Sequence, residues 1–382
     1  MFSGVANRPR RYPQRLIHSI PFLPIRDQLQ TAPYFGSVPH RVEEFLTLLG
    51  RKLLNWAWSS RLDSARKQWF ERLVGFIAIP AVAKTYETGP LEARKQLERV
   101  LDIVGEPDFP IDCIYRLANE VEHIISADPD FAGMIYEKVF GYEESSSEQT
   151  HMGGYVMPML SNRRQDYGMC RYSLMKEFRR FLGSKPFVAV RTGIRAVQAF
   201  AIQTHVLRYV REGKSLRDLT SEFRFRNTTA RYMQDGSAIW DESSYPDQEM
   251  RIVDAVFEWL GSAARQGRCD DVERVLDIFA GEALLGFMWS RLLIIGADHP
   301  AVLGPRLWEL AKAKPFLEEN DTLFSLGLFL ERAAQFVSPE QRAAVEQIIL
   351  GLRECRGGQE RILGAPTQPA ACADSSWAFG YT

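Results

Sequence analysis

The chain has few cysteines, and their spacing forms no pattern. Its 382 residues include five of them, with no C-x-x-C pair: Cys113, Cys170, Cys269, Cys355 and Cys372. A disulfide framework or a zinc site needs closer, repeated spacing, so the sequence predicts free thiols in a reducing compartment. The six histidines are scattered without the spacing of metal ligands. We therefore expect no metal and no other cofactor.

Long apolar segments are absent as well. No run of about 18 apolar residues occurs, which argues against a membrane span and a membrane partner. The N-terminal residues are basic, but Pro9, Pro13, Pro21 and Pro24 interrupt any apolar stretch that could serve as a signal peptide. We therefore expect a soluble, cytoplasmic protein.

Local catalytic motifs are also missing. The sequence contains no G-x-x-x-x-G-K-[ST] phosphate loop, no H-E-x-x-H zinc motif and no G-x-S-x-G nucleophile turn. A triad built from distant residues would leave no local pattern, so this absence argues only weakly against an enzyme. It favours a non-catalytic protein.

Helical periodicity dominates from residue 40 onward. Apolar residues recur every three or four positions, as in Val42, Phe45, Leu46 and Leu49. About a dozen helices with short connections fit either a compact bundle or an α-solenoid. Similar turn-plus-helix segments, such as "GSKPF" and "KAKPF", favour an all-α, irregular HEAT-like solenoid over residues 40–354. We expect a Pro-rich, basic N-terminal arm over residues 1–39 and an irregular tail over residues 355–382.

Several local signals refine this prediction. Asp128 is expected to cap a helix, and Ser338 with Gln341 forms a capping-box pattern around Pro339. Further helices are predicted over residues 247–266, 270–294, 300–314 and 319–335. Alternating Phe223 and Phe225 and a turn at 235–236 suggest a short β-hairpin between residues 221 and 241.

Charge is unevenly distributed along the chain. Residues 101–150 hold twelve acidic and two basic residues, a net charge of −10, whereas residues 161–231 hold sixteen basic and five acidic residues, a net charge of +11. These blocks cancel, so the whole chain has a formal charge of −1. The basic block either contacts a charged partner or pairs with the acidic block, with ordinary solvated faces as the simpler interpretation.

The basic block supplies the candidate binding residues. Arg164 and Arg171 are seven residues apart and are expected to share a helix face away from the apolar stripe, and Arg191 and Arg195 are four apart on the next helix. Rows of guanidinium groups on neighbouring helices could bind phosphates or an acidic protein surface. The full candidate set is Arg163, Arg164, Gln165, Asp166, Tyr167, Arg171, Arg179, Arg180, Arg191 and Arg195.

A long insertion precedes this block. Residues 141–161 lack helical periodicity, and loops of this length in packed helical proteins usually have a function. Its acidic, Ser-rich first half is typical of a disordered insertion, whereas Met152, Met157 and Met159 could make adaptable apolar contacts. We expect a mobile part over 143–150 and a packed part over 152–160.

The segment "FGYEESSSEQTHMGGYVMPMLSNRRQDYGMCRY" resembles a segment of very large bacterial STAND-type NTPases, many of which are implicated in phage defence. The residues that carry the resemblance are Gly141-Tyr142, Met152-Gly153, Met157-Pro158 and 161–167. It covers about 35 residues well. In that family an effector domain and a P-loop ATPase precede helical repeats, and neither is visible here. The resemblance implies only the repeat part, with a sensor or scaffold role.

Two functions follow as expectations. The first is a non-catalytic helical-repeat module that recognises a protein partner, as a sensor part in bacterial defence. The alternative is a nucleic-acid-binding HEAT-like protein that uses the Arg-rich faces of 161–231. Some HEAT-like proteins are DNA glycosylases, but no catalytic residue of theirs can be matched here. A protein scaffold predicts that the acidic block compensates the basic residues, whereas a nucleic-acid binder predicts that they are aligned on one exposed concave face.

Overall fold

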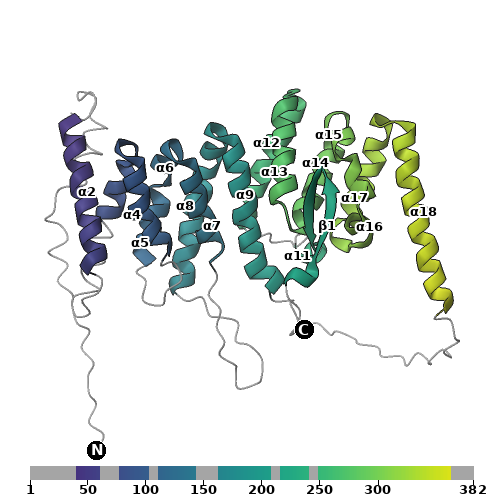
Figure 1. Ribbon diagram of the computed structural model, residues 1–382, viewed down its shortest axis with the longest axis horizontal. Helices are drawn as coiled ribbons and strands as arrows, with labels where there is room; N and C mark the ends of the chain where they lie inside the picture. Colours follow the sequence, from purple (N-terminus) through teal and green to yellow (C-terminus); the bar gives the residue numbers. More distant parts are fainter. Residues whose placement is uncertain are drawn as a thin grey trace, which may run out of the picture.

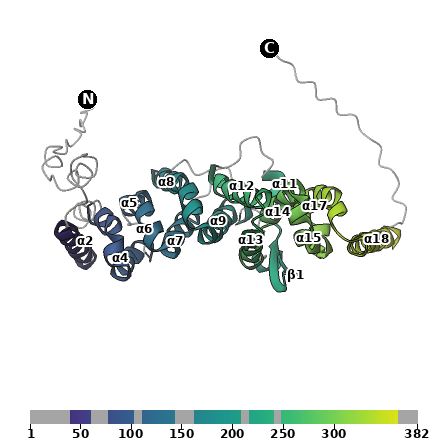
Figure 2. The same cartoon turned by 90° about the horizontal axis from the view of Figure 1, so that it is seen from above.

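A computed structural model describes residues 40–60, 77–102, 111–142, 162–207, 216–240 and 248–362. In this part the chain forms an elongated row of short helices, with one two-stranded sheet (Figure 1). Seen from above, the helices lie in two layers along the row (Figure 2). This arrangement confirms the predicted all-α, irregular solenoid with a small hairpin.

The N-terminal half contains α2 and the helices up to α9. Their bounds are α2 His40–Ser60, a helix described over 77–84, η2 Tyr86–Thr88, α4 Pro90–Asp102, α5 Ile111–Asn119, α6 Val121–Ala127, α7 Pro129–Phe140, α8 Asn162–Ser184, α9 Pro186–Ala201 and the π-helical turn η3 Ile202–Val206.

The C-terminal half begins with the hairpin. Its elements are η4 Leu216–Leu219, β1 Thr220–Phe225, β2 Thr228–Met233, α11 Ser237–Trp240, η5 Gln248–Met250, α12 Arg251–Arg265, α13 Cys269–Glu282, α14 Gly286–Asp298, α15 Pro300–Leu307, η6 Trp308–Lys312, α16 Lys314–Glu318, α17 Asn320–Ala333, η7 Ala334–Phe336 and α18 Pro339–Ile362.

The two layers explain which helices meet. In one layer α5 packs on α8 and α8 on α12; in the other α7 packs on α9 and α9 on α13. Further contacts join the layers, such as α8 with α9 and α12 with α13. Most of the helices bury an apolar stripe between the layers, so the core runs along the row although the row is only two helices thick.

The predicted caps are present. The side chain of Asp128 accepts a hydrogen bond from the backbone N–H of Phe131 at 2.9 Å, at the start of α7. The backbone N–H of Gln341 donates to Ser338 Oγ at 3.3 Å, and Gln341 Oε1 accepts from the Ser338 N–H at 3.2 Å. Both reciprocal bonds of the capping box therefore fix the start of α18.

One predicted helix is wrong. The segment 270–294 contains two helices, α13 and α14, separated by an extended segment from Ala283 to Leu285. The reason is tertiary: the backbone N–H of Met233 donates to the Leu284 carbonyl at 2.7 Å, and Met233 forms a parallel bridge with Leu285. Strand β2 thus holds this segment extended, which the local apolar pattern does not reveal.

The hairpin is confirmed, but its predicted turn is misplaced. In the register of the hairpin, Phe225 of β1 pairs with Thr228 of β2. The turn residues are therefore Arg226 and Asn227, with φ angles of 49° and 61°. Two consecutive residues with positive φ match the twist of the flanking strands. Phe223 and Phe225 face inward, and both rings contact Trp289 of α14 at centroid distances of 5.2 and 5.8 Å.

The last helix extends beyond residue 354, the predicted end of the helical-repeat domain. Helix α18 continues to Ile362, into the segment expected to be an irregular tail from residue 355. The helix formers around Gly357-Gly358, such as Arg353, Glu354 and Glu360, outweigh the two glycines. The predicted N-terminal arm (1–39) and residues 143–161 of the predicted insertion lie outside the described residues.

Candidate functional site

The first candidate residues lie at the N-terminal end of α8. Arg163 and Arg164 belong to this helix, but their side chains are outside the described part of the structure. Gln165 is exposed and Asp166 half-buried. Tyr167 is buried and stacks on Tyr142 at a ring-centroid distance of 3.7 Å, so it joins the start of α8 to the end of α7.

Arg171 does not lie on an exposed face, and this corrects the sequence-based expectation. Only 6 % of the residue is exposed. Its Nε donates to the Val139 carbonyl at 3.3 Å, its Nη2 donates to the Tyr142 carbonyl, and its Nη1 lies 3.4 Å from Glu249. The guanidinium also sits over the ring of Phe200, 5.0 Å from its centroid. Arg171 therefore joins α7, α8 and η5 and offers little surface to a ligand.

The remaining arginines are exposed and ion-paired between helices. Arg179 Nη2 lies 2.9 Å from Glu258, and Arg180 pairs with Glu122. Arg195 forms two 2.8 Å hydrogen bonds with Glu282. The Glu282 hydrogen bonds raise the pKa of Arg195, and the carboxylates of Glu137 and Asp130 add to this effect. Arg191 lies 3.4 Å from the same Glu282.

The partners of these arginines come mainly from outside the acidic block. Glu122 lies within residues 101–150, whereas Glu249, Glu258 and Glu282 follow the basic block in the chain. The arginines are therefore compensated, but mostly by helices that stack on their C-terminal side. Exposed pairs of this kind contribute little stability, about 0–1 kcal/mol each.

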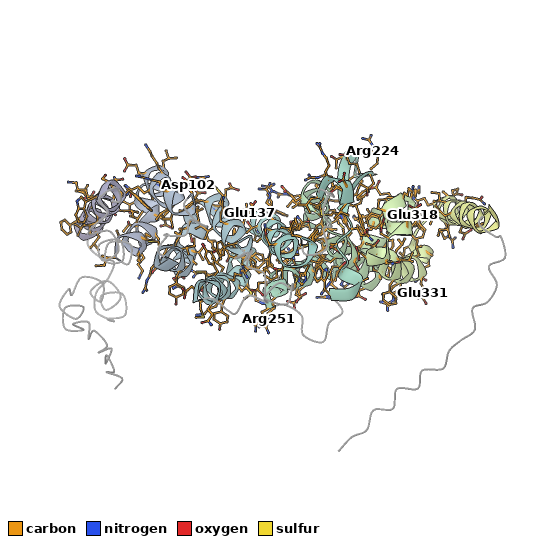
Figure 3. All side chains as sticks on the ribbon, turned by 90° about the horizontal axis from the view of Figure 1, so that it is seen from below. Asp102, Glu137, Arg224, Arg251, Glu318 and Glu331 are labelled. Carbon is orange, nitrogen blue, oxygen red and sulfur yellow. The ribbon has the colours of Figure 1, made fainter. Side chains whose placement is uncertain are left out.

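The arginines also lie on different faces of the row. Figure 3 places Arg251 on one long edge and Glu137 on the opposite edge. Arg179 lines a groove together with Arg251, whereas the charge of Glu137 acts on Arg195 and raises its pKa. The candidate arginines thus do not form one continuous basic surface.

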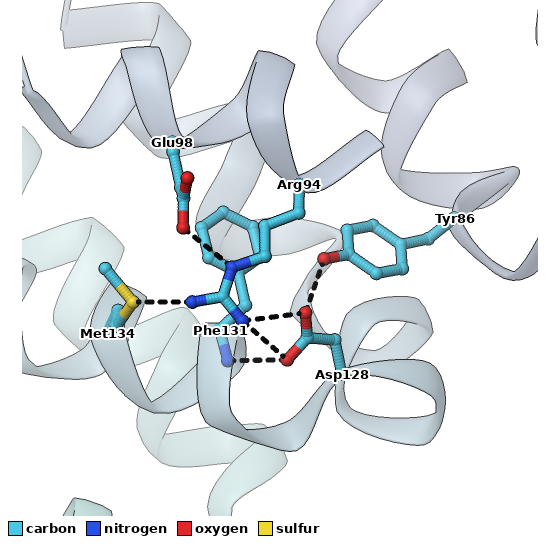
Figure 4. Close-up of polar contacts among 6 residues, drawn as sticks. All are labelled: Tyr86, Arg94, Glu98, Asp128, Phe131 and Met134. Carbon is cyan, nitrogen blue, oxygen red and sulfur yellow. Dashed lines mark hydrogen bonds and ion pairs between the residues drawn. The ribbon is translucent and has the colours of Figure 1, made fainter. Parts of the chain in front are cut away.

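A dense polar cluster surrounds Asp128 (Figure 4). Its carboxylate accepts a 2.9 Å hydrogen bond from the hydroxyl of Tyr86 and a 3.2 Å bond from Arg94 Nη1, besides capping α7. Arg94 Nε also donates to Glu98 at 2.7 Å. Burial and the Asp128 carboxylate raise the pKa of Tyr86. Because the groups of this cluster bond one another, we interpret it as a structural joint between α4 and α7.

A second internal cluster involves two buried carboxylates. Asp321 Oδ2 accepts from the backbone N–H groups of Asp235 and Gly236 at 2.9 and 3.1 Å, and Oδ1 accepts from that of Ala238 at 3.2 Å. The Asp235 carboxylate in turn accepts from Phe287 N–H at 3.0 Å. The chain's own carboxylate fills this nest of N–H groups, which ties α11 to α17.

The buried carboxyl of Asp235 is expected to make the free energy of unfolding depend on pH. Burial, and then the negative charge of Asp321, raise its pKa to about 7. An unfolded chain loses this proton near pH 3.9, so between about pH 4 and 7 the folded state holds the extra proton. The stability that Asp235 contributes is thus present at low pH and is lost as the pH rises through 7.

Urea unfolding at pH 5 and pH 8 checks this prediction. The free energy of unfolding of the wild type, relative to that of Asp235→Asn, is expected to be higher at pH 5 than at pH 8. A difference that does not change with pH would contradict the raised pKa. Using the variant as reference removes the contribution of carboxylates that do not interact with Asp235.

A groove between α8 and α12 is a candidate site near the basic block. It has a volume of about 180 Å³. Its apolar part comes from Tyr172, Met175, Phe178, Ile252 and Ala255, and its polar part from Lys176, Arg179, Gln248 and Arg251.

The charged residues that line this groove are all positive. Three of its lining residues are basic and none is acidic. Arg179 pairs with Glu258, but Lys176 and Arg251 form no ion pair with any residue that the structure describes. Tyr172, which is more than half exposed, lines the groove together with Lys176 and Arg251. The groove can therefore hold an apolar group flanked by anions.

The sequence identified only part of this groove. Arg179 was among the candidates, whereas Arg251 was missed because 72 residues separate it from Arg179 and only the packing of α12 on α8 brings them together. Helical spacing could have found Lys176, which is four residues after Tyr172 on the same exposed face.

Over the described ranges, no group of three His, Cys, Asp or Glu side chains is placed to bind a metal ion. Within the same ranges, no helix combines the length and apolar character needed to cross a membrane. Burial raises the pKa of Cys170 to about 12, so this thiol is a poor nucleophile at neutral pH.

The chain was compared with families, curated proteins and solved structures. No family model, no curated protein and no solved structure matches it. The resemblance to STAND-type NTPases therefore remains a prediction that rests on residues 141–167.

Proposed function

We propose that this chain is a non-catalytic helical-repeat recognition module that binds an acidic segment of a protein partner in the groove between α8 and α12. The observation that carries the proposal is the groove itself, which combines an apolar floor with three basic and no acidic lining residues. Helical repeats commonly present extended surfaces of this kind to protein ligands.

The arrangement of the other arginines supports a protein ligand over a nucleic acid. A duplex needs several cations aligned along one face to contact successive phosphates. Here Arg171 is buried, and Arg179 and Arg195 lie toward opposite edges of the row, each with a carboxylate partner. With the STAND-like segment upstream of the groove, we further propose a sensor role in bacterial defence.

The preferred peptide follows from the groove's chemistry. Met175, Phe178 and Ile252 favour one apolar side chain of the ligand, and Lys176 with Arg251 favours carboxylates on either side of it. The probe is a fluorescein-labelled peptide with a central leucine between runs of glutamate. Two further peptides replace the leucine by serine or the glutamates by glutamine.

The double variant Lys176→Ser/Arg251→Ser is expected to bind the acidic peptide about fivefold more weakly, because each exposed charge contributes about 0.2–1 kcal/mol. Fluorescence anisotropy measures the affinity. The matched control is Arg224→Ser/Arg231→Ser, which removes two exposed cations from the outer face of the hairpin.

The proposal requires that the control variant binds like the wild type and that both altered peptides bind more weakly. Equal weakening by the two double variants would show unspecific attraction and would contradict a specific groove. Tight binding of duplex DNA instead would support the alternative function.

A further inference from the structure

A cavity lies between α2 and α4, two helices near the N-terminal end of the row in Figure 1. Its volume is about 520 Å³, within the usual range of small-molecule sites. Both helices line it with the same spacing: Leu48, Arg51, Lys52 and Asn55 on α2, and Glu92, Lys95, Gln96 and Arg99 on α4. Positions i, i+3, i+4 and i+7 form one face of a helix, so each helix directs a whole face into the cavity.

The cavity has an excess of positive charge. Four basic residues line it, against Glu44 and Glu92. Arg51 is already engaged, since its Nη1 lies 3.2 Å from Glu92 and its Nη2 donates to the Gly89 carbonyl at 3.1 Å. Lys52 and Lys95 are exposed and make no ion pair with a residue in the described ranges.

Arg99 extends the cationic wall. Its guanidinium lies over the ring of Trp58, 5.2 Å from the ring centroid. This contact orients the side chain and still leaves N–H groups for a ligand. Lys52, Lys95 and Arg99 thus provide three cations, from both walls, for one anionic group.

Gln96 adds a second, independent feature. Only 7 % of this residue is exposed, and its Oε1 is buried without a hydrogen-bond partner in the described part. Its Nε2 donates to the Arg51 carbonyl at 3.5 Å. If the oxygen and nitrogen of the Gln96 amide were exchanged, the oxygen would face this carbonyl oxygen, and two acceptors would lie against each other. An unpartnered buried acceptor is unfavourable, and a ligand O–H or N–H would satisfy it once the side chain turns this atom toward the cavity.

We propose that this cavity binds a small organic phosphate that carries hydroxyl groups. The phosphate would lie against Lys52, Lys95 and Arg99, and a hydroxyl or amino group would donate to Gln96 Oε1. The Glu92 carboxylate, held by Arg51, provides a further acceptor for such donors. A nucleotide and a sugar phosphate share this chemistry, and the test distinguishes them.

The test is isothermal titration of the full chain with four probes: AMP, ribose 5-phosphate, inorganic phosphate and ribose. Binding of AMP or ribose 5-phosphate at least about tenfold tighter than that of inorganic phosphate and ribose supports the site. If AMP binds more tightly than ribose 5-phosphate, the ligand is of the nucleotide class. If the two bind equally, the sugar phosphate is sufficient for binding.

Two variants assign the binding to this cavity. Lys52→Ser/Lys95→Ser should weaken ribose 5-phosphate at least about tenfold, whereas the control Arg224→Ser/Arg231→Ser should not change it. Gln96→Leu should weaken ribose 5-phosphate but leave inorganic phosphate unchanged, and its melting temperature reports folding. No binding at millimolar concentration, equal binding of inorganic phosphate (an adventitious ion only), or affinity unaffected by the Lys52/Lys95 variant overturns the proposal.

Discussion

Replacing Arg171 by alanine is expected to lower the free energy of unfolding by about 3–5 kcal/mol, the usual cost of breaking a buried charge pair. The substitution would leave the carbonyls of Val139 and Tyr142 without their guanidinium donor and Glu249 without its cation. It would also remove the contact with Phe200. Because these groups come from α7, α9 and η5, the loss would loosen the centre of the row.

Urea unfolding followed by circular dichroism measures this effect. Arg179→Ala is the matched control, because it removes an exposed arginine and an exposed ion pair from the same helix. Its effect should stay within about 0.5 kcal/mol. If Arg171→Ala were as mild as this control, Arg171 would not be the joint described above.

Replacing Asp321 by alanine is the second large effect, expected to lower the free energy of unfolding by about 2–3 kcal/mol. Three backbone N–H groups, those of Asp235, Gly236 and Ala238, would lose their acceptor. The Asp235 N–H is buried and the other two are part-buried, and an unsatisfied buried donor costs about 1–3 kcal/mol. We also expect the segment 235–238 to lose protection against amide hydrogen exchange, since α11 would no longer be tied to α17.

Hydrogen-exchange mass spectrometry and urea unfolding test this together. Asp298→Ala, which removes a half-exposed carboxylate paired with Arg332, serves as the control and should change stability by less than about 1 kcal/mol. Unchanged exchange over 235–238 in Asp321→Ala would show that the loop is held by other contacts.

Local signals predicted much of the fold. The capping box at Ser338 and the cap at Asp128 depend on residues three positions apart, which the sequence shows directly. The hairpin turn at Arg226-Asn227 was missed because Asp235-Gly236 is the stronger turn pattern. That pair instead donates backbone N–H groups to Asp321, about 85 residues away, which no local pattern reveals.

The candidate site was predictable only in part. Spacing from Arg164 suggested an exposed Arg171, yet Arg171 is also four residues after Tyr167 and three before Leu174, both of which are buried. Helical geometry therefore placed it beside the core stripe, and this second spacing was the better guide. Arg251 of the groove depends on the packing of α12 against α8, which required the structure.

The most direct test of the proposed function compares the acidic peptide with a 20-base-pair DNA duplex across a salt series. We predict that the peptide binds the wild type at about 150 mM salt, that Lys176→Ser/Arg251→Ser weakens this binding, and that the duplex binds weakly. Duplex binding tighter than peptide binding, with a steep loss of affinity as salt rises, would contradict protein recognition and show that the arginines contact phosphates.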